Sequence, residues 1–371
     1  MSLNRFRIKQ QKPNYFLPLL AFMLSVFGLM MVYSASVVLS YQQFGYNYYY
    51  LNKQAVSLVI GIFALIIGLR IDYRIWQKNA FGLFVVSLVF LIAVFIPGIG
   101  ENLGGSSRWI HIGPLFFQPS ELAKITFIFY LSSWISKKGD DIKSFEKGFI
   151  PFIFITALTG LLIMKEPDMG TTLIIAAIAV SIFYTSGAKL NHIFAGLISA
   201  AGVFWILIKT SPYRLQRFLV FLDPNAKSLD AGYHINQALL AIGSGGWWGL
   251  GFGQSKQKYL YLPEVHIDSI YAIIVEELGF LRSGLVIIAF ILLGYIGYRI
   301  AKTAPDNFSK LVATGITSWF VFQAFLNIAT MLGAVPLTGV PLPFISYGGS
   351  SLIVLLFAVG VLMNISKQCN K

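Results

Sequence analysis

A run of polar residues ends at Asp268, just before an apolar segment that begins at Ile270. Glu264 and His266 lie close to it in the chain. A carboxylate where a membrane-spanning helix begins is costly to keep unless it serves a function. In a cleft of low dielectric its pKa rises, which suits a general base for a hydroxyl nucleophile. Such a carboxylate can also bind Mg²⁺ or Mn²⁺, with substrate phosphates completing the coordination. Asp268 is therefore the predicted catalytic residue and a candidate metal ligand, and helix capping is the alternative.

Glu121 and Lys124 form a second candidate pair. Pro119 and Ser120 indicate the start of a helix, and residues three apart share one face of it. Lys124 lies about one turn into an apolar run, where charged residues usually face a cavity or a partner. We interpret the pair as the lining of a polar cavity that binds substrate, and a structural ion pair is the alternative.

Three other charged or polar residues are predicted to bind substrate. Arg108 follows two serines and precedes Trp109, and its planar guanidinium suits a phosphate group, although an interfacial, snorkelling arginine would look the same. Asp168 follows Glu166-Pro167, and a helix cap is its alternative role. His266 lies two residues before the predicted catalytic aspartate.

Glu276 lies eight residues beyond Asp268, on roughly the same helical face, and either contacts substrate or packs against polar groups of other spans. Ser346 and Tyr347 belong to a polar cluster at 336–351, predicted on the same side of the membrane. They complete the predicted substrate-binding set.

The composition defines the elements that must hold these residues. The chain has 371 residues, of which 56% are hydrophobic and only 12% are charged. Soluble domains have about 45–50% apolar and about 25% charged residues, so this is predicted to be an all-α polytopic membrane protein. Its apolar segments predict about ten transmembrane helices, at 16–39, 55–69, 80–97, 122–136, 148–164, 171–185, 190–208, 270–297, 310–332 and 349–366. The sixth is short, and Pro167 and Gly170 before it predict an irregular pair with the fifth.

The loops predict an orientation. Lys and Arg are concentrated in alternate loops, which places both termini in the cytoplasm, with tails at 1–14 and 367–371. One large extracytoplasmic loop, 209–269, then joins spans seven and eight. We treat 1–371 as a single transmembrane domain. The net charge of +13 follows this loop pattern and does not indicate nucleic-acid binding. The single cysteine, Cys369, excludes an internal disulfide.

Other classes of membrane protein are less well supported. The sequence lacks a Gly-x-x-x-x-Gly-Lys phosphate loop and a sizeable cytoplasmic domain, so an ATP-driven pump and a nucleotide cofactor are not expected. No inverted pair of broken helices stands out, which disfavours a secondary transporter. The glycine-rich segment 243–253 reads as a tight turn or an interfacial loop.

Several motifs together resemble the SEDS family (shape, elongation, division and sporulation proteins). They are Met31-Val-Tyr-Ser-Ala-Ser36, Arg108-Trp-Ile, Phe117-Gln-Pro-Ser-Glu-Leu-Ala-Lys124, Glu166-Pro-Asp-Met-Gly-Thr171, Gly232-Tyr-His-Ile-Asn-Gln237, Ala241-Ile-Gly-Ser-Gly-Gly246, Tyr261-Leu-Pro-Glu264, Asp268, Glu276-Glu-Leu-Gly-Phe280 and Pro341-Leu-Pro-Phe-Ile-Ser-Tyr-Gly-Gly-Ser-Ser351. The resemblance covers nearly the whole chain, and segment 253–264 is closer to the cell-division type than to the elongation type.

The resemblance implies a peptidoglycan glycosyltransferase that polymerises lipid II on the outer face of the bacterial cytoplasmic membrane. It assigns catalysis to Asp268, places Glu121 and Lys124 in a central cavity, and implies a class B penicillin-binding protein and other division or elongation machinery as partners. Arg108 and Lys124, or a metal, would offset charge on the departing pyrophosphate. A lipid II flippase and a non-catalytic scaffold are the alternatives.

Two departures from the family pattern concern the site. The family commonly has Thr before the aspartate and Phe after it, whereas this chain has Ile267 and Ser269. Loss of the preceding hydroxyl would alter the orientation or the pKa of Asp268. Arg282 stands where the family usually has an apolar residue or glycine, and the sequence does not explain it.

Overall fold

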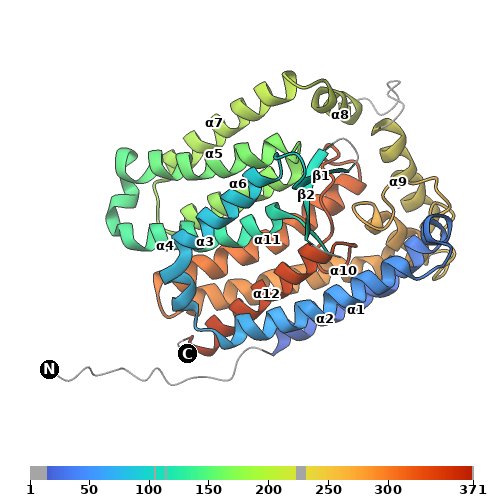
Figure 1. Ribbon diagram of the computed structural model, residues 1–371, viewed down its shortest axis with the longest axis horizontal. Helices are drawn as coiled ribbons and strands as arrows, with labels where there is room; N and C mark the ends of the chain where they lie inside the picture. The colour runs from blue at the N-terminus through green and yellow to red at the C-terminus, as the bar shows by residue number, and fades with distance from the viewer. Residues whose placement is uncertain (1–14, 104–105, 113–114, 223–230, 370–371) are drawn as a thin grey trace.

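Helices occupy all ten predicted spans. The computed structural model describes residues 15–103, 106–112, 115–222 and 231–369, so the N-terminal tail 1–14 with its basic residues lies outside the described residues. The ten helices are α1 (Phe16–Phe44), α2 (Tyr49–Arg70), α3 (Tyr73–Ala93), α4 (Pro119–Lys138), α5 (Ile150–Lys165), α6 (Met169–Thr185), α7 (Leu190–Lys209), α10 (Ile270–Thr303), α11 (Asn307–Met331) and α12 (Gly349–Lys367). They lie side by side in one bundle (Figure 1).

Length and composition agree with a multi-pass membrane protein. Within the described part of the chain, eight helices are long and apolar enough to cross a membrane. The other two are α6, which has only 17 residues, and α4, which carries Glu121 and Lys124 near its start. The predicted fold class is confirmed. The short sixth span is also as predicted, and Glu166–Asp168 form the break that separates it from α5.

Side-chain caps and small residues fix several helix ends and contacts. Asp72 accepts a hydrogen bond from the Arg74 amide at the start of α3, and Asp306 forms a capping box with Ser309 at the start of α11. The most buried of the membrane-length helices, α12, packs on α2. There, Gly360 lies directly against the carbonyl of Leu65, so a larger side chain would separate the two helices.

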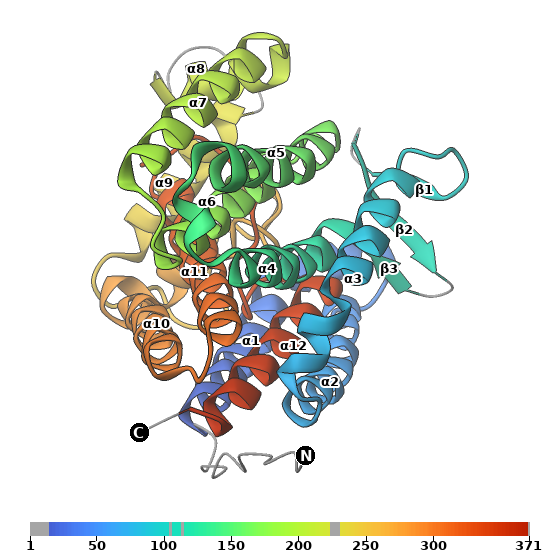
Figure 2. The same cartoon turned by 90° about the vertical axis from the view of Figure 1, so that its left-hand side faces the viewer.

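Most of the elements outside the spans lie at one end of the bundle. Residues 100–117 form an antiparallel sheet of β1 (Gly100–Leu103), β2 (Ser106–Ile112) and β3 (Leu115–Phe117), in the order β1-β2-β3. It projects from between α3 and α4 (Figure 2). The large loop contains α8 (Pro212–Leu222) and α9 (Ala231–Gly245). At the other end, η1 (Gly139–Lys143) and η2 (Phe145–Phe149) join α4 to α5. Neither these strands nor α8 and α9 were predicted from the sequence.

A break in α10 receives the glycine-rich segment. Gly279 has φ 79° and ψ 171°, which only glycine adopts readily, and its surroundings include the backbone of Trp248 and Gly249. The amides of Leu250 and Gly251 donate to the carbonyls of Glu276 and Glu277 at 2.9 and 3.0 Å. This segment is therefore a tight turn docked on α10, as the sequence indicated.

Candidate functional site

Asp268 lies at the entrance to α10 and is held through its backbone. The side-chain amide of Asn327 on α11 donates to the carbonyl of Asp268 at 2.8 Å and to that of Val340 at 2.7 Å. Asn327 thus links Asp268 to residues 332–348. We call this segment, which joins α11 to α12, the α11–α12 loop. A methyl group built on Gly339 of this loop would lie 3.7 Å from Asp268 Oδ2. Helix α11 and this loop together fix the position of the carboxylate.

The Asp268 carboxylate is buried and incompletely satisfied. Its Oδ1 atom has no hydrogen-bond partner among the described residues. Burial raises the pKa of Asp268 to about 6, against the lowering effects of backbone N–H groups, the Arg217 charge and the Ser269 hydroxyl. A carboxyl with that pKa is ionised at pH 7 and protonates readily, as a general base requires.

Ser269 provides a hydroxyl directly after Asp268, whereas the family commonly has one directly before it, at the position of Ile267. Its Oγ lies 2.6 Å from His234 Nε2 on α9 and donates to the Pro263 carbonyl at 2.8 Å. Burial, with the Arg217 charge, lowers the pKa of His234 to about 4, so the imidazole is neutral at pH 7. The hydroxyl therefore follows Asp268 in this chain, and it ties α9 to the site.

The predicted residues His266 and Tyr347 are in contact, and Ser346 precedes Tyr347 in the α11–α12 loop. The Tyr347 amide donates to the His266 carbonyl at 2.8 Å, and their rings are 5.3 Å apart. Ser346 Oγ accepts from the Leu342 amide at 2.8 Å within the α11–α12 loop. Gln54 of α2 holds the same loop, because its side chain donates to the Ser346 carbonyl and accepts from the Gly348 amide.

Glu121 and Lys124 form a buried ion pair that reaches the same loop. Lys124 Nζ lies 2.8 Å from Glu121 Oε1, donates to Gln323 Oε1 at 3.1 Å, and sits 4.8 Å from the centre of the Trp319 ring. Gln323 in turn donates to the Pro341 carbonyl at 2.9 Å. Gln323 and Asn327 are one turn apart on α11, so this helix connects the ion pair to Asp268. Glu121 Oε2 has no partner among the described residues.

Arg108 and Asp168 stabilise the turn at residues 166–168, between α5 and α6. Arg108 donates to the carbonyls of Glu166 and Pro167 at 2.8 and 2.7 Å. Asp168 caps α6 by accepting from the amide and the hydroxyl of Thr171, both at 2.8 Å. Gly170, in the first turn of α6, packs against Val340 of the α11–α12 loop. The turn therefore supports that loop. Asp168 has the helix-capping contacts that were its alternative role, whereas Arg108 anchors the turn through two backbone carbonyls, a role that was not predicted.

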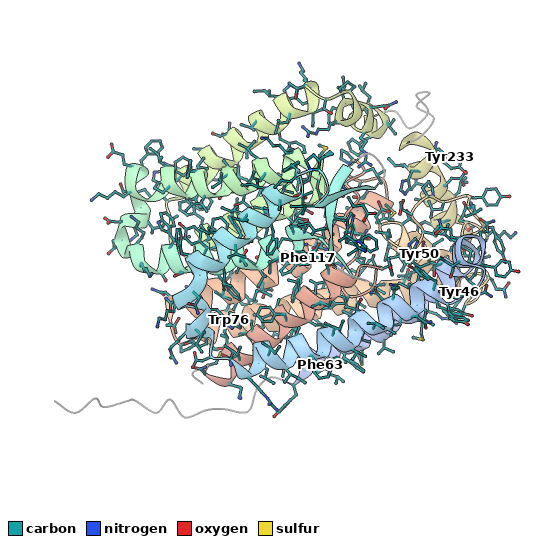
Figure 3. The ribbon with its side chains drawn as sticks, viewed as in Figure 1. Tyr46, Tyr50, Phe63, Trp76, Phe117 and Tyr233 are labelled. Carbon is teal, nitrogen blue, oxygen red and sulfur yellow. The ribbon has the colours of Figure 1, made fainter. Side chains whose placement is uncertain are left out.

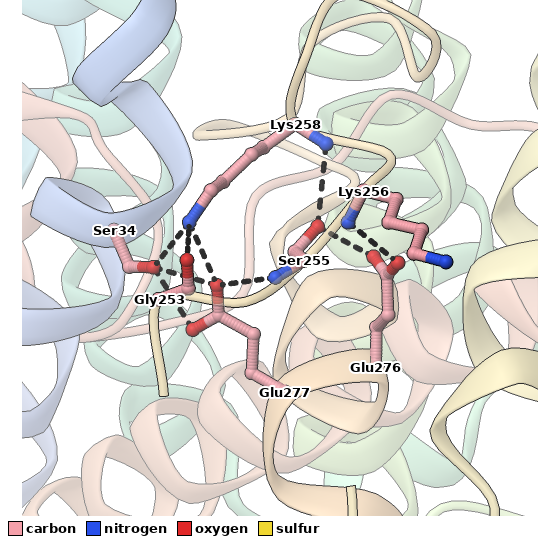
Figure 4. A network of polar contacts seen from close by, with 7 residues as sticks. All are labelled: Ser34, Gly253, Ser255, Lys256, Lys258, Glu276 and Glu277. Atoms are coloured by element: carbon pink, nitrogen blue, oxygen red, sulfur yellow. Dashed lines mark hydrogen bonds and ion pairs between the residues drawn. The ribbon is translucent and has the colours of Figure 1, made fainter. Parts of the chain in front are cut away.

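Glu276 lies further along α10, in a different network (Figure 4). Its carboxylate accepts hydrogen bonds from the Ser255 hydroxyl and the Lys256 amide. Glu277 accepts from Ser34 of α1 and pairs with Lys258 Nζ at 3.2 Å, where both side chains are buried. These contacts anchor segment 253–258 to α10. Glu276 is therefore not part of the proposed substrate site.

Sequence reasoning missed Gln323, Asn327, Arg217 and His234. Gln323 and Asn327 carried a usable signal, since two amides one turn apart in an apolar helix are costly unless they are bonded. Arg217 and His234 lie in the large loop, where polar residues are ordinary. His234 belongs to the motif at 232–237, which assigned it no role, and no sequence signal distinguished Arg217 from the other basic residues of the loop.

The described residues bring no three His, Cys, Asp or Glu side chains together as a metal site. The Oδ1 atom of Asp268 has no partner within the described part of the chain, and Glu264 lies near enough for the Asp268 charge to raise the pKa of Glu264. These two carboxylates could hold a cation only if a substrate supplied most of its ligands. Mg²⁺ is often bound in this way, through one or two carboxylates and substrate phosphates.

Fold and site together define a polytopic helical membrane protein with a buried carboxylate and a buried ion pair linked at one end of the bundle. The chain belongs to the cell cycle protein family FTSW_RODA_SPOVE, whose family model matches residues 15–371. The predicted family resemblance is thereby confirmed.

Similar proteins are found by sequence and by structure. Stage V sporulation protein E of Bacillus subtilis is 39% identical, over 97% of this chain and 98% of that protein. The probable peptidoglycan glycosyltransferase FtsW of a Geobacter species is 40% identical, over 94% and 95%. A chain solved in a study of polymerization and crosslinking by a peptidoglycan synthase complex has a TM-score of 0.80 at 25% identity and covers 95% of this chain and 97% of its own. RodA of Thermus thermophilus has a TM-score of 0.72 at 23% identity, with full coverage of both chains.

Proposed function

We propose that this protein is a peptidoglycan glycosyltransferase that polymerises lipid II at the outer face of the cytoplasmic membrane. The observation that carries the proposal is the buried carboxylate of Asp268, with its orphaned oxygen and raised pKa. The family membership and the relatives named as probable peptidoglycan glycosyltransferases support the same chemistry.

The proposed reaction needs one base and a means of stabilising the leaving group. Asp268 accepts the proton of an acceptor sugar hydroxyl while that oxygen forms a bond to the anomeric carbon of the donor. The bond from this carbon to the pyrophosphate oxygen breaks, and undecaprenyl pyrophosphate leaves with the electron pair. Lys124 and Arg108 offset its charge, and Arg217 is a third cation near Asp268. If a divalent cation takes part, Asp268 and Glu264 would supply its protein ligands.

We further propose a role in septal wall synthesis with a class B penicillin-binding protein as partner. The FtsW relatives support this role, and so does the similarity to a chain from a peptidoglycan synthase complex that coordinates polymerization and crosslinking. Other division machinery would complete the assembly, and an elongation role is the alternative. Depletion of the protein should give filamentous cells if it serves division and spherical cells if it serves elongation.

The decisive experiment supplies labelled lipid II to the purified complex with its transpeptidase. We expect Asp268→Asn to lower the polymerisation rate by about a hundredfold or more, since a general base contributes on the order of 10²–10⁴. Asp72→Asn is the matched control, because Asp72 caps α3 at the opposite end of the bundle. Normal polymer synthesis by Asp268→Asn would refute the catalytic assignment. Movement of labelled lipid across vesicles without polymer would indicate a flippase.

A further inference from the structure

A row of aromatic rings lies at the turn between α1 and α2, at the same end of the bundle as Asp268. The Tyr49 ring stacks on Phe44, with centroids 3.6 Å apart and planes at 11°. Tyr46 lies 4.9 Å from Tyr48 and 6.1 Å from Tyr49, and Tyr50 meets Tyr49 edge-on at 5.3 Å. Figure 3 labels Tyr46 and Tyr50 at this end of the molecule.

The inner end of the row contacts the site. The Tyr50 ring centroid lies 4.4 Å from that of His266 and 5.1 Å from that of Tyr347. His266 is two residues from Asp268 and only 4% exposed, yet its Nδ1 atom has no partner among the described residues. The Nδ1 atom can therefore form one further hydrogen bond, as donor or acceptor according to the tautomer of the ring.

The outer end of the row is open. Tyr46 and Tyr48 are 38% and 53% exposed, whereas Tyr50 is partly buried between them and the site loops. Tyrosines are common at membrane interfaces, where they anchor a protein among lipid head groups. That role does not explain rings that contact one another in series and end on a buried, unsatisfied imidazole beside Asp268.

We propose that this row, from Phe44 to Tyr50 with His266 and Tyr347, is a saccharide-binding platform that leads to and from Asp268. Aromatic faces are electron-rich and attract the C–H groups on the flat face of a sugar ring, while a sugar hydroxyl can form a hydrogen bond with the imidazole nitrogen that has no partner among the described residues. Several rings in series suit an oligosaccharide better than a single sugar. The inference rests on the proposed function and specifies where that function binds its glycan.

The test removes rings and measures both the length of the glycan strands and the KM for lipid II. We expect Tyr50→Leu and Tyr46→Leu to shorten strands or to raise KM by about two- to tenfold, the range expected for losing one aromatic contact. Shorter strands at an unchanged initial rate would assign the platform to the growing polymer, and a raised KM would assign it to the incoming substrate. Tyr50→Phe keeps the ring and should behave like the unaltered protein.

Tyr41→Leu is the matched control, since Tyr41 is 63% exposed and lies one turn before Phe44 on the same helix. If Tyr50→Leu and Tyr46→Leu match this control in both measurements, the platform does not exist. A binding measurement with soluble chitotetraose tests the platform independently of polymerisation activity. Binding that Tyr50→Leu weakens and Tyr41→Leu does not would support the platform even if the protein made no polymer, and equal binding by both variants would overturn it.

Discussion

At the scale of single residues, two opposing effects set the acidity of Asp268. Burial removes the carboxylate from water and raises its pKa, while the Arg217 charge, nearby N–H groups and the Ser269 hydroxyl favour the ionised form. Desolvation prevails and leaves the pKa at about 6, above the ordinary value of 3.8. The Arg217 guanidinium also donates to the Leu337 carbonyl at 3.0 Å, which fixes α8 to the α11–α12 loop.

The first prediction concerns the pH dependence of polymerisation. A general base must be deprotonated, so the rate should be constant above the Asp268 pKa and fall about tenfold per pH unit below it, with a midpoint near pH 6. The measurement is a pH–rate profile with lipid II below its KM. A midpoint near pH 4, typical of an exposed aspartate, would mean that the carboxylate is not desolvated when it reacts.

The second prediction uses the charge of Arg217. Arg217→Gln removes a positive charge that lowers the pKa of Asp268, so the midpoint of the profile should move to higher pH. Arg214→Gln is the matched control on the same helix, because Arg214 donates to the carbonyls of Met164 and Leu207 instead. Equal shifts in the two variants would show that the change comes from α8 as a whole and not from the charge at 217.

At the scale of elements, a buried ion pair holds the segment that leads to the site. Lys258 and Glu277 are both buried, and Ser34 of α1 donates to the same carboxylate at 2.7 Å (Figure 4). Helix α1, the large loop and α10 thus meet at one ion pair. Removing one member of such a pair leaves an unpaired buried charge, which costs more than removing both.

The third prediction follows from this asymmetry. Lys258→Met and Glu277→Gln should each lower the free energy of unfolding by about 3–5 kcal/mol, and the double variant should lose less than the sum. Thermal unfolding in detergent measures the difference. Asp140→Asn breaks an exposed pair with Lys143 and should leave the melting temperature unchanged. Strictly additive losses would show that the two charges do not depend on each other.

Part of the fold and of the candidate site could be predicted from the sequence. Hydropathy predicted all ten helices because a spanning segment needs a long apolar run, and a spacing of three predicted that Glu121 and Lys124 would meet. The strands at 100–117 are short, and α8 and α9 have only 11 and 15 residues, so none of them forms a long apolar run, although α8 is amphipathic. Gln323 lies 199 residues from its partner Lys124, and only the packing of α11 against α4 brings them together.

At the scale of the whole molecule, the parts that build the site share one end of the bundle. The sheet, α8, α9, the α1–α2 turn and the α11–α12 loop meet there, while η1, η2 and the C-terminus lie towards the other end (Figure 1). Basic residues are concentrated in the loops of that other end, including Lys137, Lys138, Lys143 and Lys147. From the positive-inside tendency we expect the site to lie outside the cytoplasm.

The fourth prediction tests this orientation directly. Cys369 is the chain's single cysteine and is buried, so replacing it with serine leaves a background for introduced thiols. In intact spheroplasts, a membrane-impermeant maleimide should label Tyr259→Cys, where the native side chain is 58% exposed at the site end. Asp140→Cys lies in η1 at the opposite end, on a side chain that is 95% exposed, and should react only after permeabilisation. The reverse pattern would place Asp268 on the cytoplasmic side, where it could not extend a wall polymer outside the cell.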